Sequence, residues 1–192
     1  SKKISIDAGF EHLSGQSQTD TSFSYRTVNH SFTPHFGTNH KFNGYMDYFY
    51  VGNHIGSVGL NDAFLGLKYT HEKFWLKADV HYFLAAAPVR DGYKIMLDNN
   101  AAIIAGTPLS EIDQYQEMDN YLGTEIDFTF GFKLAKDVDV KGGYSVLMNS
   151  ETLSYLKGVT DINGRGLEKN SNGWGWLMIT VKPKFINGED KK

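Results

Sequence analysis

The chain contains no cysteine, only 4 prolines and a formal net charge of just −3 in 192 residues. Without cysteine it forms no disulfide, no thiolate zinc site and no cysteine nucleophile. It also lacks any run of about eighteen apolar residues, the minimum for a membrane-spanning helix. The slight acidic excess offers no basic surface for phosphate groups, so we expect no nucleic-acid partner. Aromatic residues (14%) and 20 glycines are abundant instead, a composition typical of strands joined by turns.

The clearest pattern lies between Tyr121 and Leu147, where apolar and polar residues alternate along two adjacent segments. Alternation at every second position indicates a β-strand with one apolar and one polar face. Only residues 135–137 separate the two segments, which predicts a β-hairpin. Each strand is about ten residues long, the length of a tilted transmembrane strand. The apolar face, which we expect to contact lipid, carries Ile126, Phe128, Phe130 and Phe132.

The same alternation recurs along the chain and gives six predicted strands in all. The other four are Lys3–Leu13, Asn61–Thr70, Phe74–Ala85 and Gly173–Phe185. The connections alternate in length: about 14–60, 71–73, 86–120, 135–137 and 149–172. Short periplasmic turns and long extracellular loops are typical of outer-membrane barrels. We therefore predict an all-β fold over residues 1–185, an antiparallel up-and-down transmembrane β-barrel, followed by a polar tail at 186–192.

Six strands are too few for a closed pore. A barrel of eight strands already fills its interior with side chains, and the bilayer does not tolerate open sheet edges. We therefore expect the first and last strands to pair with further barrel strands, supplied by an N-terminal portion or by other protomers.

The long connections carry two further predictions. Leu109, Ile112, Tyr115 and Met118 recur every third residue and predict a short amphipathic helix. The 14–60 connection either folds inward as a constriction of the pore or forms an ordered outside loop with its own aromatic cluster. Its histidines lack the spacing of a metal site, so we expect none. The candidate constriction residues are His40, Tyr45, Asp47, Tyr48, Tyr50 and His54.

Charged residues on the polar faces of the strands are the candidate lining of a pore, because rings of charge set the field inside a channel. Alternatively, they pair with one another across strands and stabilise the wall. The candidates are Asp7, Glu11, Asp62, Lys68, Lys77, Asp79, His81, Glu125, Asp127, Lys133, Asp139, Lys141 and Lys182.

Two sequence patterns are weak indications of a catalytic site and of a calcium site. Ser145 and His81 share the polar face with Asp79 or Asp127, but no nucleophile elbow accompanies them, so we predict no enzyme and no catalytic residue. The segment 161–166 begins like a calcium loop but lacks the terminal bidentate glutamate, and its Asn-Gly pair is first a turn signal. We expect no cofactor.

Several segments carry a resemblance to a known family: His40–His54, Gly59–Tyr69, His81–Pro88, Leu122–Val138 and Trp174–Phe185. Together they resemble the C-terminal part of alginate-export-type outer-membrane porins of Bacteroidetes-like bacteria. The resemblance implies a barrel that passes solutes through the outer membrane. It also implies that Phe185 closes a C-terminal strand recognised by the barrel-assembly machinery. The mixed charges of the polar face do not favour alginate itself as the solute.

The functional prediction is a porin-like channel segment of the bacterial outer membrane, surrounded by lipid and open to small hydrophilic or oligosaccharide solutes. One alternative is a soluble or periplasmic β-barrel or sandwich that binds a ligand. Another is a passive barrel subunit of a larger outer-membrane assembly.

Overall fold

The computed structural model describes residues 2–33, 43–49, 57–167 and 171–183. Six long strands form one antiparallel sheet in the order β1-β2-β3-β4-β5-β6, with each strand paired to its neighbour in sequence. The strands are β1 (Lys2–Leu13), β2 (Leu60–His71), β3 (Phe74–Leu84), β4 (Tyr121–Ala135), β5 (Val138–Asn149) and β6 (Ser171–Val181). The predicted all-β, up-and-down topology is confirmed. Within the described residues the sheet is open, because β1 and β6 each have one neighbour.

Strand pairing joins residues into rows that share a face of the sheet. One row runs through Ile6, Leu67, Ala78, Phe128 and Tyr144. Its apolar side chains are exposed, Ile6 to 71% and Phe128 to 57%. The row beside it runs through Asp7, Gly66, Asp79, Asp127 and Ser145 on the opposite face, where Asp127 and Ser145 are fully buried. The sheet therefore exposes its apolar face and buries much of its polar face.

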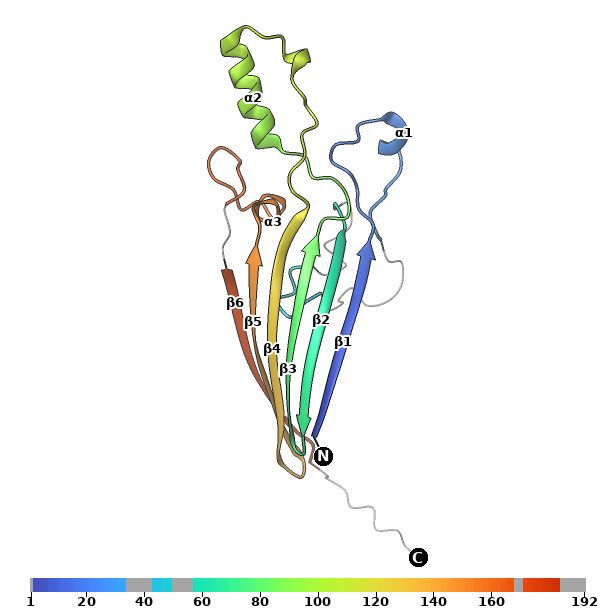
Figure 1. Ribbon diagram of the computed structural model, residues 1–192, viewed down its shortest axis with the longest axis vertical. Helices are drawn as coiled ribbons and strands as arrows, with labels where there is room; N and C mark the ends of the chain where they lie inside the picture. The colour runs from blue at the N-terminus through green and yellow to red at the C-terminus, as the bar shows by residue number, and fades with distance from the viewer. Residues whose placement is uncertain (1, 34–42, 50–56, 168–170, 184–192) are drawn as a thin grey trace, which may run out of the picture.

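The connections divide between the two ends of the sheet. Two-residue turns, 72–73 and 136–137, join β2 to β3 and β4 to β5. Figure 1 shows both turns at the end opposite to α1 (Phe23–Arg26), α2 (Gly92–Ala105) and α3 (Glu151–Leu156), which belong to the three long connections. The apolar core lies at this loop end and contains Leu13, Leu60, Phe83, Leu122, Leu147 and Leu153. Among the described residues no helix is long and apolar enough to cross a membrane.

Two predicted element positions were wrong. The helix expected around Leu109–Met118 is only a single 3-10 turn, η2 (Leu109–Glu111), and the helix of this connection is α2. Asp91 accepts a hydrogen bond from the Lys94 N–H at its start, and Gly106 ends it with a φ of 71°. The last strand ends at Val181 rather than Phe185, because its partner β5 begins at Val138, directly after the 136–137 turn. Phe185 itself lies outside the described residues.

Glycines opposite aromatic rings shape the sheet. On the polar face a Cβ at Gly131 would lie 2.5 to 2.8 Å from the Trp75 indole, and a Cβ at Gly143 would lie 2.8 Å from Trp176 Nε1. The missing side chains let each ring lie flat across its neighbouring strand, a pairing that fixes register. Strand glycine otherwise weakens a sheet, so these rings compensate for it.

We predict that Gly131→Ala destabilises the sheet by about 1–3 kcal/mol, because the new methyl group would overlap the Trp75 ring. The midpoint of urea unfolding measures the change. Gly175→Ala is the matched control, since its nearest atom, in Tyr144, is 3.3 Å from the added Cβ. A Trp75→Leu change should restore most of the stability lost in Gly131→Ala. Equal destabilisation by both alanine variants would contradict the packing explanation.

Candidate functional site

The polar face holds the largest cluster of buried charged groups in the described residues. Asp62, Asp79, His81, Glu125 and Asp127 are each less than a tenth exposed. All five project from the central strands β2, β3 and β4. The sequence places them on this face but does not explain their burial, because they were predicted to line open water.

Residues 43–49, here called the covering segment, lie against this cluster. The Met46 N–H donates a 2.6 Å hydrogen bond to Glu125 Oε1, and the Tyr45 N–H donates a 3.4 Å bond to Asp127 Oδ2. Backbone N–H groups are strong donors to carboxylates, so two of the buried charges gain partners from the segment itself. Residues 43–49 therefore fold over the polar face, whereas the earlier part of the same connection, with α1, stays at the loop end of the sheet (Figure 1).

The start of the covering segment is held by the side chain of Asn43, which is 1% exposed. Its Nδ2 donates to Glu11 Oε2 at 2.9 Å and to Asp62 Oδ2 at 3.1 Å, on β1 and β2. One amide thus joins two acidic residues on neighbouring strands, and it places the segment across the sheet rather than along one strand.

Gly44 permits this close approach in two ways. Its φ of 78° lies in the left-handed region that other residues rarely adopt. A Cβ at this position would also overlap the carboxyl group of Glu125. The Gly44 backbone therefore lies directly on the carboxyl group that accepts the hydrogen bond from the Met46 N–H.

A second group of charges is paired across strands. The Lys77 ammonium lies 2.7 Å from Asp79 Oδ1 and 3.5 Å from Asp7 Oδ2. Gly66, on β2, lies between Asp7 on β1 and Asp79 on β3. A side chain at this position would overlap both carboxyl groups. His81 Nδ1 lies 3.0 Å from both Asp62 oxygens, and because a carboxylate only accepts, the histidine donates.

The predicted pore-lining residues thus fall into two sets. Those near the covering segment are Asp7, Glu11, Asp62, Lys77, Asp79, His81, Glu125 and Asp127. The others lie closer to the hairpin end, with Lys68 directly opposite Lys77 of the first set: Lys68, Lys133, Asp139, Lys141 and Lys182. Among them Lys68 lies 4.8 Å from the Trp75 ring centre, and Lys182 lies 3.5 Å from Asp139.

Acidic groups dominate beside the covering segment. Six carboxylates share the cluster with one lysine and one histidine. Asp79 Oδ2, Glu125 Oε2 and Asp127 Oδ1 are buried and have no hydrogen-bond partner in the described part of the chain. This excess of acidic over basic groups favours cations and neutral molecules over anions next to the segment.

Three of the predicted constriction residues lie in the covering segment. Tyr45 is half-buried with its ring centre 6.3 Å from that of Trp176, and burial, reinforced by nearby Asp79, raises the pKa of its hydroxyl. Asp47 is exposed and has a φ of 57°, and Tyr48 is partly buried. His40, Tyr50 and His54 lie outside the described residues.

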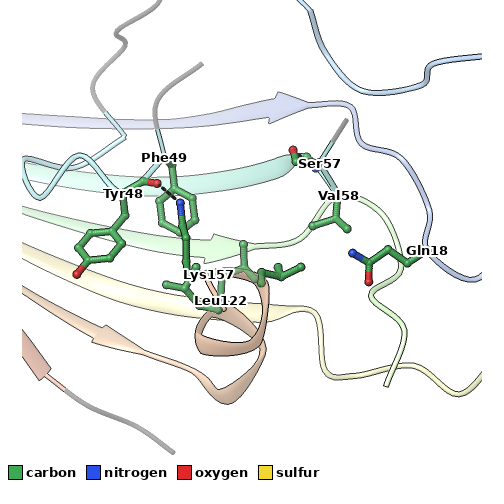
Figure 2. A pocket seen from close by; sticks show the side chains of 10 residues that line it. Gln18, Tyr48, Phe49, Ser57, Val58, Leu122 and Lys157 are labelled. Carbon is green, nitrogen blue, oxygen red and sulfur yellow. Dashed lines mark hydrogen bonds between the residues drawn. The ribbon is translucent and has the colours of Figure 1, made fainter. Parts of the chain in front are cut away.

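The far end of the covering segment is anchored to the loop core. Figure 2 shows Lys157, just after α3, donating from Nζ to the Tyr48 carbonyl at 2.9 Å. Phe49 packs on Phe83 with ring centres 4.5 Å apart, beside a cavity of about 210 Å³. Burial lowers the pKa of the Lys157 ammonium. Sequence reasoning missed Lys157 and Asn43, since neither stands in a recognisable motif.

The two weak chemical patterns of the sequence correspond to structural features of the fold. Ser145 lies on β5 and His81 on β3, so β4 separates them by about 10 Å, too far for a catalytic hydrogen bond. The described hydrogen bond of His81 goes to Asp62. Asp161 accepts from the N–H groups of Asn163 and Arg165, which makes residues 161–166 a turn capped by its own carboxylate.

We predict that Gly44→Ala releases the covering segment, because the substitution adds backbone strain of about 1–3 kcal/mol and overlaps the Glu125 carboxyl group. Hydrogen exchange at the Tyr45 and Met46 amides should accelerate at least about tenfold. Gly106→Ala is the matched control, with a similar φ of 71° and no atom within 4 Å of the new Cβ. Unchanged exchange at both amides would refute the seating of Gly44 on Glu125.

We predict that Lys157 makes stability rise with pH below about pH 10, the ordinary range of lysine. Its folded-state pKa is lowered, so the unfolded chain binds the proton more tightly and folding is favoured as protons leave. Urea unfolding at pH 8 and 9.5 should show this rise in the wild type and a smaller one in Lys157→Met. The same slope in both proteins would exclude Lys157 as its source, and Lys94→Met, on exposed α2, is the control.

Comparisons with known proteins found no matching family model, no matching curated protein and no matching solved structure.

Proposed function

We propose that this chain forms part of an outer-membrane β-barrel through which small hydrophilic or oligosaccharide solutes diffuse. In this proposal the apolar face of the sheet contacts lipid and the polar face lines the solute path. The covering segment narrows that path. Selection then depends on width and charge rather than on chemistry, and no residue acts as a catalyst.

The observation that carries the proposal is the inverted burial of the sheet. Ile4, Leu67, Leu76, Phe128 and Leu177 lie on one face of five strands and are each more than half exposed. Soluble proteins rarely expose contiguous apolar patches larger than a few hundred Å². A sheet with charged residues inside and apolar residues outside suits a hydrocarbon solvent.

The ends of the strands support the same proposal. Two-residue turns at one end and long connections with helices at the other match the asymmetry of outer-membrane barrels (Figure 1). Within the described residues β1 and β6 each leave one edge unpaired, and in lipid such edges require partners because unpaired backbone groups are costly there. We propose that further strands, from an N-terminal portion or from other protomers, close the barrel.

A soluble ligand-binding module is less compatible with these observations. Its core would lie under the apolar face, yet no described segment covers that face. A passive subunit of a larger assembly shares the lipid-facing surface but conducts no solute, so conductance separates it from the proposed pore.

We predict that the intact protein isolated from membranes conducts ions in planar bilayers. Replacing residues 43–49 by a Gly/Ser linker of equal length should raise the single-channel conductance, because the polar face would be uncovered. An equal-length replacement of residues 99–105 in α2, at the loop end, is the control and should leave conductance unchanged.

Each outcome has a defined meaning. A silent intact protein would refute the pore. A conducting protein with the same conductance after replacement of residues 43–49 would refute the constriction while leaving the pore in place.

A further inference from the structure

An open hollow of about 580 Å³ lies between the covering segment and the beginning of β6. Tyr45, Asp47 and Tyr48 line it from the covering segment, and Asn172 and Trp174 line it from β6. Its volume is in the range of small-molecule sites, which combine aromatic walls with a few polar groups.

Trp174 is the least expected residue of this hollow. It stands opposite Ser145 and so shares the polar face with Asp127, yet 46% of its surface is exposed. Packing does not require an exposed indole beside buried carboxylates. Trp75, by comparison, lies across Gly131 with the Lys68 ammonium over its ring.

Three aromatic rings follow one another along the path. The Trp174 and Trp176 ring centres are 6.4 Å apart, and the Tyr45 ring lies 6.3 Å from Trp176 at an angle of 25°. They form a continuous surface from the open hollow to the buried acidic cluster. Flat aromatic faces bind apolar surfaces that also carry polar edges, and the C–H face of a pyranose ring is such a surface.

The polar groups of the hollow complement the hydroxyl groups of a sugar. Asp47 supplies a carboxylate and Asn172 an amide, and both residues are exposed. Figure 2 shows the Tyr48 ring directed away from Phe49 and Lys157, so its hydroxyl is not used in the loop core. Asp47 is held in a left-handed backbone conformation, φ 57°, which costs energy and is common at binding sites.

The charge of the surroundings selects among sugars. Asp47 lies in the hollow, and Glu125 and Asp127 bind the neighbouring residues of the same segment. Among the described residues, the ammonium groups of Lys157 and Lys77 lie near this segment. Lys157 Nζ is bound to the Tyr48 carbonyl, and Lys77 Nζ is paired with aspartates of the sheet. The excess of acidic over basic groups among the described residues disfavours uronate oligomers relative to uncharged sugars.

We propose that the hollow lined by Trp174, Tyr45, Tyr48, Asp47 and Asn172 is a binding subsite for neutral oligosaccharides on the solute path. The subsite deepens the proposed pore function, on which it rests. A sugar stacked on Trp174 would pass along Trp176 and Tyr45 to the covering segment.

The test uses tryptophan fluorescence of the intact protein in detergent, since the chain has only 3 tryptophans. Maltohexaose, cellohexaose and xylohexaose are titrated separately, with tri-galacturonate as the charged comparison. We expect a saturable change with at least one neutral sugar and a response at least tenfold weaker to the uronate. Trp174→Ala should weaken neutral-sugar binding at least tenfold, Trp174→Phe less, and Trp75→Phe not at all.

The result that would overturn the subsite is a channel that conducts but responds to none of the three neutral sugars. Equal responses in Trp174→Ala and wild type, measured from Trp176, would overturn it too. Circular dichroism and conductance of the same preparations establish that each variant is folded. Saccharide binding by a protein that conducts nothing would refute the pore and the solute path, and would leave only a saccharide-binding hollow at Trp174.

Discussion

A carboxylate removed from water must meet hydrogen-bond donors, and this requirement connects the separate parts of the molecule. An unpaired ion in a protein interior costs several kcal/mol even after relaxation. Glu125 and Asp127 are completely buried, and their donors are the N–H groups of Met46 and Tyr45, about 80 residues earlier in the chain. The sheet therefore needs the covering segment as much as the segment needs the sheet. Without the segment, these buried carboxyl groups lose their N–H donors.

The opposite face of the sheet is apolar and is left uncovered by the described part of the chain. Its rows of isoleucine, leucine and phenylalanine cross the strands without any described segment packed on them. Within the described residues the apolar core is confined to the loop end, where Phe83, Leu122 and Leu147 meet Phe49 of the covering segment. The sheet is thus fixed by cross-strand hydrogen bonds, by rings lying over glycines and by the covered charges. A surrounding apolar solvent would add the remaining stabilisation.

The strands were predictable because alternation of period two repeats over ten or more residues, and the start of β4, for example, was predicted at Tyr121, where it lies. The alternation alone does not tell which face of the sheet is exposed, because a soluble sheet has the same alternation. The helix α2 was missed because its apolar residues form no marked stripe, although Asp91 and Gly106 mark its ends. The aromatic residues of the covering segment were recognisable in the sequence. Its position on the sheet was not predictable, because contacts such as those of Asn43 with Glu11 and Asp62 join residues that are distant in the chain.

The kind of contact that holds the covering segment determines which of its residues are free to vary. Its bonds to Glu125 and Asp127 come from backbone N–H groups, which almost every amino acid supplies. The side chains of Tyr45, Asp47 and Tyr48 line the hollow beside Trp174. Gly44 and Asn43 have no such freedom, since one needs a missing Cβ and the other joins two carboxylates. A fixed backbone with variable side chains suits a path whose width stays constant while its preference for solutes changes.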